Sequence, residues 1–181
     1  EEELRAVTES FAGDYMQVPP MYSALKVNGK KLYELAREGK TVERKPRPVH
    51  FYEIEILDID FPLVRFRVTC SKGTYIRTLC HDIGEKLGCG AAMETLLRTK
   101  VGRFTLDDAI TLAQTEEAVR NGEIEQRILG IEEILAEYPR VCCTKEGDRL
   151  LANGNPLVQA LVNAEEKDGW IRMCNSEGSF A

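Results

Sequence analysis

The sequence is poor in the residues that build metal and cofactor sites. It has two histidines, at positions 50 and 81, and none of its six cysteines stands in a C-x-x-C pair. A zinc site is therefore not expected, because such sites are built from closely spaced cysteines and histidines. A glycine-rich nucleotide-binding loop is also missing. We expect no metal and no cofactor, and we expect the cysteines to be reduced, buried thiols.

Long apolar runs are equally scarce. No stretch approaches the roughly 18 consecutive apolar residues of a membrane-spanning helix, and the opening Glu-Glu-Glu-Leu-Arg does not look like a signal peptide. Of the 181 residues, 43% are hydrophobic and 30% are charged. This composition is typical of a globular protein with a real core, and it predicts a cytoplasmic location without a membrane partner.

The charges are unevenly distributed along a chain whose net charge is −6. Residues 26–47 hold eight basic and three acidic side chains, whereas residues 107–139 hold nine acidic and two basic ones. The first segment could face a polyanion while the second turns away from it. The basic segment could equally be only a solvated face.

Apolar periodicity and turn residues predict a mixture of helices and strands. Helices are expected at 1–11, 30–38, 76–87, 91–99, 115–120 and 126–137. Two β-branched and aromatic runs, 49–60 and 63–70, are separated by Phe61-Pro62 and predict an antiparallel hairpin. A further short strand is expected at 101–104.

Tyr138-Pro139 predicts a domain boundary between residues 1–138 and a tail of residues 139–181. In the tail we expect a strand at 141–143, a helix at 145–152, and strands at 157–162 and 170–174 joined by a charged turn. A tail of this length is shorter than most domains that fold alone.

The stretch from Cys70 to Gly84 holds the side chains with the clearest chemical potential. It reads as a strand, a break at Gly73 preceded by the basic Lys72, and then a helix. Tyr75 and Arg77 fall where the strand gives way to the helix, and there side chains can project into a cleft. A tyrosine ring can stack on a base, and an arginine can pair with a carboxylate or phosphate. The structural alternative is that Tyr75 caps the core and Arg77 makes a surface ion pair.

Several segments resemble signatures of the TruB family of tRNA pseudouridine synthases, in the order and spacing of that family. The segments are CSKGTYIRTLCHDIGEKLGCG from Cys70, QVPPMYSALK from Gln17, GKKLYELAR from Gly29, LLRT from Leu96 and, more weakly, NGNP from Asn153. The resemblance implies an α+β fold. It would comprise the later part of a pseudouridine synthase catalytic domain, with a mainly antiparallel sheet and helices, plus a partial, β-rich PUA-like domain in the tail.

The resemblance also implies roles for individual residues. Tyr75 resembles the active-site tyrosine that stacks on the target base and takes a proton, and Arg77 the arginine that pairs with a nucleophilic aspartate. Leu96 resembles the apolar wall of the uracil pocket. Residues of about 20–47 resemble a mobile arm that closes over the T-arm of tRNA. The resemblance thus implies that tRNA is the partner of this protein. The substrate-binding residues that the resemblance implies are five in this arm and Lys72 in the turn before residue 76. The five are Tyr22, Lys26, Lys30, Lys31 and Arg37.

One departure from the family concerns the nucleophile. Its aspartate lies in a motif of the form G-x-L-D-x-x-A-T-G, which this sequence does not contain. We therefore expect this chain to be a fragment that is inactive by itself. A non-catalytic RNA-binding module on the same scaffold is an alternative interpretation. A relative that works inside a guide-RNA particle is another, although the full-length arm favours the stand-alone bacterial type.

Overall fold

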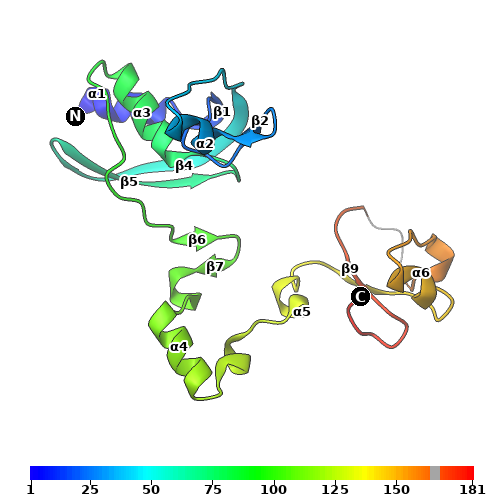
Figure 1. The fold of residues 1–181 in the computed structure, drawn as a ribbon. Coiled ribbons are helices and arrows are strands. Elements are labelled where there is room, and N and C mark those ends of the chain that lie inside the picture. The colour runs from blue at the N-terminus through cyan, green and yellow to red at the C-terminus, as the bar shows by residue number, and fades with distance from the viewer. Residues whose placement is uncertain (164–167) are drawn as a thin grey trace. The chain divides into compact units, whose positions relative to one another are not determined.

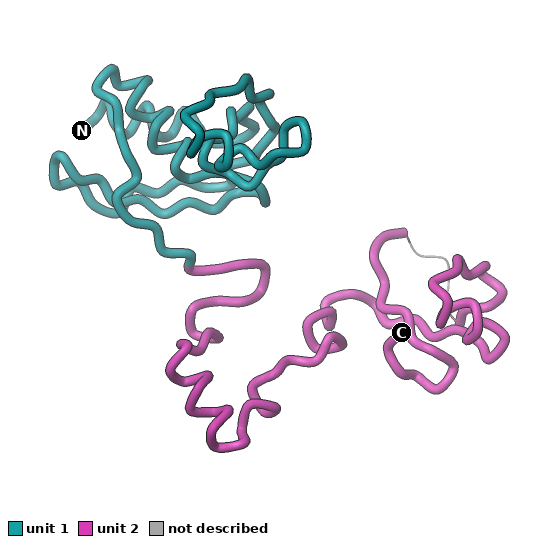
Figure 2. Tube along the Cα trace, viewed as in Figure 1, with its two compact units in different colours: residues 1–98 teal, residues 99–181 magenta. Residues whose placement is uncertain are grey.

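The computed structural model describes residues 1–163 and 168–181. The chain divides into two compact units, Glu1–Arg98 and Thr99–Ala181 (Figure 2). Among the described residues, no helix is both long and apolar enough to cross a bilayer.

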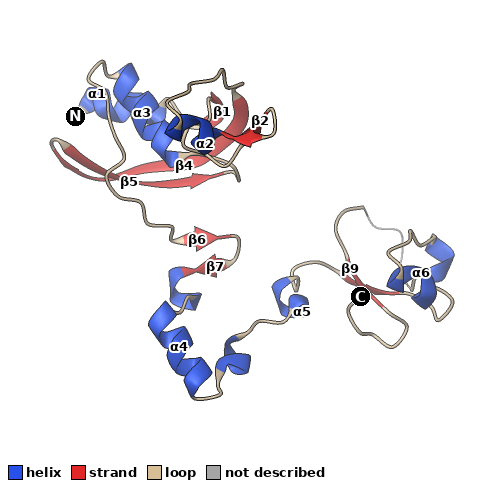
Figure 3. Ribbon diagram, in the orientation of Figure 1, coloured by secondary structure: helices blue, strands red, loops and turns tan. Residues whose placement is uncertain are grey.

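A three-stranded antiparallel sheet forms the base of the first unit. Its strands are β1 (Gly13–Gln17), β4 (Arg47–Asp60) and β5 (Leu63–Cys70), in the order β1-β4-β5 (Figure 3). The predicted hairpin is confirmed, with Ile54 opposite Val68 and Ile56 opposite Phe66. Half-buried and exposed residues alternate along β5, as expected for a strand with one face on a core.

Helices α1 (Glu2–Glu9) and α3 (Ile76–Lys86) cover one face of this sheet (Figure 1). The core between them consists of Leu4, Phe11, Val49, Phe51, Leu79 and Ile83. Burying each such side chain contributes about 1.5–3 kcal/mol. The predicted helices at 1–11 and 76–87 are confirmed within one or two residues at each end.

The basic segment folds into a small subdomain between β1 and β4. It contains the hairpin of β2 (Lys26–Val27) and β3 (Lys30–Lys31), followed by α2 (Leu32–Arg37). At the hairpin turn Asn28 and Gly29 have φ angles of 51° and 83°, the left-handed pair that a tight two-residue hairpin requires. Leu32 and Leu35 of α2 are buried.

The predicted helix at 91–99 is wrong, because these residues form no regular element. The chain crosses α3 at Gly84, where an added Cβ would lie 2.1 Å from the backbone nitrogen of Ala91. Most side chains after the crossing are exposed. A nine-residue helix with no apolar surface to cover is only marginally stable in water.

The second unit begins with a small hairpin and continues through short helical elements. Residues 101–104, predicted as a strand, are instead the turn of this hairpin, because Val101 ends its first arm and pairs with Phe104, which begins its second. The second acidic helix is shorter than predicted. Its elements are β6 (Lys100–Val101), β7 (Phe104–Thr105), η1 (Leu106–Asp108), α4 (Leu112–Arg120), η2 (Ile124–Arg127), α5 (Ile131–Ile134), β8 (Arg140–Cys142), α6 (Asp148–Ala152), η3 (Gln159–Leu161) and β9 (Arg172–Cys174).

In the tail, β8 and β9 pair in parallel. The run 157–162 forms the turn η3 rather than a strand, and its last residue, Val162, bridges to Cys143. The predicted charged turn falls largely on residues 164–167, outside the described residues. Among the described residues of this unit, the buried hydrophobic side chains are Ala118, Val141, Cys143 and Cys174.

Candidate active site

The turn that precedes α3 is fixed to the neighbouring strand β4. The backbone N–H of His50 donates to Oγ of Ser71 at 2.9 Å, and the N–H of Ser71 donates to the carbonyl of His50 at 2.8 Å. Gly73 adopts a φ of 83°, which allows the chain to reverse. Lys72 is exposed on this turn. These contacts determine where α3 begins.

Gln17 holds the N-cap residue of the helix, Tyr75, in place. Its side chain is buried at 1% exposure, its Oε1 accepts from the N–H of Tyr75 at 2.8 Å, and its Nε2 donates to the carbonyl of Tyr75 at 3.1 Å. Tyr75 is half-buried at the N-cap position, and its carbonyl also accepts from the N–H groups of Thr78 and Leu79. Sequence patterns assigned no role to Gln17. The only signal for it was its place at the start of the family-like segment QVPPMYSALK, directly before Val-Pro-Pro.

Arg77 lies at the edge of a cleft of about 290 Å³ in the first unit. Its side chain is exposed and makes no hydrogen bond or ion pair with any part of the chain that the structure describes. The guanidinium is therefore available to a carboxylate or phosphate. The cleft is lined by Val18, Pro20, Met21, Arg44, Arg77, Thr78, His81 and Asp82.

The one carboxylate in the cleft lining is already occupied. Asp82 accepts a hydrogen bond from the hydroxyl of Tyr15 at 2.9 Å and lies 3.2 Å from Nδ1 of His81. Burial, together with this hydrogen bond, raises the pKa of Tyr15 to about 12, so the phenol stays protonated at neutral pH. Asp82 is thus a structural partner that ties β1 to α3.

The predicted basic residues of the arm surround an aromatic ring. Nζ of Lys31 donates to the hydroxyl of Tyr33 at 3.2 Å and lies 5.4 Å from the ring centre, and the guanidinium of Arg37 lies 5.3 Å from the same ring. The hydrogen bond to Tyr33 raises the pKa of Lys31, which keeps this side chain charged. Lys30 lies 3.9 Å from Glu38, at the distance limit of an ion pair. These cations are held near the protein surface with their charges accessible.

The remaining predicted residues are exposed but do not line the cleft. Tyr22 is 62% exposed, Leu96 is 58% exposed, and Lys26 is also exposed. The structure therefore joins Tyr75 and Arg77 at the start of α3 and brings Arg77 together with the base of the arm. It does not bring Leu96 into that cleft.

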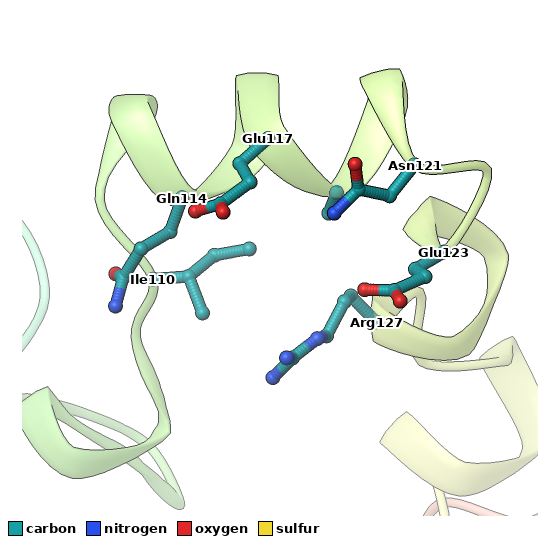
Figure 4. Close-up of a pocket in the computed structure, with 7 residues that line it drawn as sticks. Ile110, Gln114, Glu117, Asn121, Glu123 and Arg127 are labelled. Carbon is teal, nitrogen blue, oxygen red and sulfur yellow. The ribbon is translucent and has the colours of Figure 1, made fainter.

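A second cavity of about 290 Å³ lies in the other unit, between α4 and η2 (Figure 4). It is polar, and none of the residues predicted for the site contributes to it. Its lining consists of Ile110, Gln114, Glu117, Ala118, Asn121, Glu123 and Arg127. Throughout residues 1–163 and 168–181, no group of three or more histidine, cysteine or acidic side chains could hold a metal ion.

Comparison with known families gives two adjoining matches. Residues 1–76 match the TruB family pseudouridylate synthase N-terminal domain, and residues 77–136 match the tRNA pseudouridylate synthase B C-terminal domain. The two matches together extend over most of the chain, and they meet at the start of α3.

Curated relatives named tRNA pseudouridine synthase B are about half identical to this chain. The protein of Lachnoclostridium phytofermentans is 51% identical over 83% of this chain and 52% of its own length, and that of Clostridium acetobutylicum is 50% identical over 94% and 58%. The chain thus spans about half the length of these relatives.

Solved structures with a similar fold include a Cbf5-Nop10-Gar1 complex and an archaeal box H/ACA sRNP Nop10-Cbf5 complex. Each is 27% identical to this chain, with TM-scores of 0.71 and 0.66. The matches cover 99% of this chain and 53% and 52% of those chains. They confirm the α+β fold of a part of the catalytic domain.

Proposed function

The chain belongs to the TruB family of pseudouridine synthases, and we propose that the intact protein is an isomerase that converts the T-loop uridine of tRNA, at position 55, to pseudouridine. One observation carries this proposal: Arg77, unpaired among the described residues, lines a cleft from a helix whose N-cap residue, Tyr75, is held by Gln17 at both its N–H and its carbonyl. The high identity to bacterial synthases favours a stand-alone enzyme over a relative that works in a guide-RNA particle.

The proposed reaction moves one bond of the substrate. The bond between N1 of uracil and C1′ of the sugar breaks, the base rotates, C5 bonds to C1′, and C5 loses its proton while N1 gains one. Atoms and electrons balance within the substrate, so no oxidant or reductant is consumed. The target base must first leave the stack, at a cost of about a few kcal/mol.

In this reaction Arg77 would pair with a carboxylate nucleophile. A neighbouring guanidinium favours the ionised carboxylate, which is the reactive form. Tyr75 would stack on the flipped base, which contributes about 1–3 kcal/mol, and its hydroxyl would take the proton. Leu96 would complete the apolar wall around the base.

The arm and the tail would bind the RNA. We assign residues 1–138 to the catalytic domain with its arm at about 20–47, and residues 139–181 to part of a PUA-like RNA-binding domain. In the arm, Tyr22, Lys26, Lys30, Lys31 and Arg37 would contact the T-arm, as would Lys72 on the turn before α3. The exposed charges of the arm support this assignment.

The isolated chain should release no tritium from a T-arm substrate that carries tritium at C5 of the target uridine, because the chain has no nucleophile motif. Turnover by the isolated chain would contradict its interpretation as a fragment. An intact protein that binds the T-arm but releases no tritium would instead be a non-catalytic RNA-binding module.

Variants of Tyr75 and Arg77 in the intact protein test the residue roles. Tyr75→Phe keeps the ring and should bind RNA normally, with turnover lower by about 10²–10⁴-fold. Tyr75→Leu should also weaken binding, by the stacking contribution of about 1–3 kcal/mol. Arg77→Met should move the acid limb of the pH–rate profile upward, because a carboxylate without its partner protonates more readily.

Two results would reject these roles. If Tyr75→Phe retains wild-type turnover, its hydroxyl takes no part in proton transfer. If Arg77→Met leaves the acid limb in place, Arg77 does not pair with the nucleophile.

A further inference from the structure

Two residues that line the cleft beside Arg77 each carry a buried polar atom that no described residue satisfies. These are Nε of Arg44 and the hydroxyl oxygen Oγ1 of Thr78. Thr78 is only 9% exposed. Buried polar atoms almost always have a partner in native proteins, so two exceptions in one cleft indicate a ligand.

The chemistry of these two atoms restricts what the ligand can be. The Nε–H of Arg44 can only donate a hydrogen bond, and the hydroxyl of Thr78 can donate one. Nη1 of Arg44 donates to the carbonyl of Pro19 at 3.2 Å, so one side of the guanidinium is held while Nε remains free. A ligand that supplies acceptor atoms would therefore satisfy both groups.

The rest of the lining adds positive charge and an apolar wall. Arg77 is a second guanidinium in the same cleft, and the only acidic group of the lining, Asp82, is engaged by Tyr15 and His81. Val18, Pro20 and Met21 form the apolar part. An apolar wall beside two guanidinium groups fits a nucleotide, which joins a flat base and a sugar to an anionic phosphate.

We propose that Arg44 and Thr78 bind a phosphate group of the RNA backbone next to the target uridine. The inference rests on the proposed function, and it extends that function to two residues that were not among the predicted substrate-binding residues. Phosphate oxygens accept from both donors, and the apolar wall receives the adjoining sugar or base. Arg77 remains available for the nucleophilic carboxylate. The alternative source of an acceptor is a carboxylate of the protein itself.

The test uses the intact protein and a T-arm stem-loop RNA whose affinity is measured over a range of salt concentrations. Arg44→Met should weaken binding by about 10–100-fold, the range for removing a hydrogen bond to a charged group. It should also lower the slope of log affinity against log salt by about 0.7–0.9. Thr78→Val should weaken binding with little change in slope, whereas Thr78→Ser, which keeps the hydroxyl, should bind as the wild type does.

A neutral methylphosphonate placed on either side of the target uridine identifies the phosphate. At one of the two positions it should weaken binding to the wild type as much as Arg44→Met does, and it should add no further loss to Arg44→Met. If the methylphosphonate weakens binding to Arg44→Met as much as it weakens binding to the wild type, at both positions, then Arg44 does not bind these phosphates and the inference is overturned. The inference also fails if Arg44→Met lowers stability but leaves affinity and salt slope unchanged, because the partner is then a protein carboxylate.

Two features keep the test decisive. If Arg44→Met does not fold, the Thr78→Val and Thr78→Ser pair gives the answer, and equal affinities for these two variants would refute the site. RNA binding is measured as affinity, and isomerase activity is measured separately as tritium release. If the intact protein releases tritium but Arg44→Met does not change its affinity, only this inference is rejected. If Arg44→Met weakens binding but the intact protein releases no tritium, only the proposed activity is rejected.

Discussion

Replacing Gln17 with Met should lower the free energy of unfolding of the first unit by about 1.5–4 kcal/mol. Met has nearly the same volume and shape as Gln, so the change creates little cavity and removes mainly the two hydrogen bonds to Tyr75. The effect therefore measures the polar contacts rather than the packing.

The two contacts contribute unequally. The N–H of Tyr75 would have no acceptor after the change, and a buried unsatisfied donor costs about 1–3 kcal/mol. The carbonyl of Tyr75 would keep its two helical donors, from Thr78 and Leu79, so its loss is about 0.5–1 kcal/mol. The sum gives the expected range.

Urea unfolding followed by far-UV circular dichroism would measure the difference. With a slope of about 2 kcal/mol per molar urea, the midpoint should fall by about 1–2 M. Tyr15→Phe is the matched control, because it removes one hydrogen bond between the same strand and the same helix, at Asp82. A Gln17→Met protein no less stable than Tyr15→Phe would refute the reasoning.

Gln17→Glu adds a test of the hydrogen-bond directions. A carboxylate can accept from the N–H of Tyr75 but repels its carbonyl, whereas a protonated carboxyl can serve both. Burial should raise the pKa of this Glu in the folded state above about 4.3. Stability is then present at low pH and lost as pH rises through the folded pKa. A destabilisation equal at pH values of about 4 and 7 would show that the carbonyl contact is immaterial.

Other contacts give three further predictions. The double variant Lys30→Ala, Lys31→Ala should reduce the salt slope of tRNA binding by about 0.7–0.9 for each phosphate that the arm no longer neutralises; an unchanged slope would make the arm only a solvated face. Because the pKa of Tyr15 is raised from 10.0 to about 12, the unfolded state releases this proton first and stability should decline between pH 10 and 12. Tyr15→Phe should abolish that decline in urea unfolding at alkaline pH, and a decline that persists would point to another group. Gly84→Ala should destabilise the first unit by about 1–3 kcal/mol in the same assay, because its Cβ would meet a backbone nitrogen of the crossing chain at 2.1 Å. Gly130→Ala, with open space around it, serves as the control, and equal stabilities of the two variants would contradict the clash.

Sequence patterns predicted the elements that are stabilised by neighbouring residues, or whose buried side chains recur at a regular spacing along the chain. The hairpin of β4 and β5 followed from two β-branched and aromatic runs, and α3 followed from its apolar periodicity. In each case propensity, turn residues and burial agree, which is the situation in which sequence patterns succeed.

The failures depend on contacts between distant residues. Residues 91–99 have good helix formers, but the crossing at Gly84 sets their path and they have little to pack against. Gln17 and Arg44 looked like ordinary polar residues, because their partners lie 58 and 25 positions away along the chain. Site residues that act through such contacts carry no periodic signal. Tyr75 and Arg77 were found through the family resemblance, and their roles stay predictions.

The unequal burial of the two units has a consequence for amide hydrogen exchange. Amide protons in α3 and β4 are covered by the core of the first unit and should exchange only when that unit unfolds as a whole. In the described part of the second unit few side chains are buried, and Leu112 and Val119 of α4 are 85% and 58% exposed. Amides there should exchange through fraying of single turns, many times faster. The chain would then show two exchange regimes, with the change falling near the junction of Arg98 and Thr99.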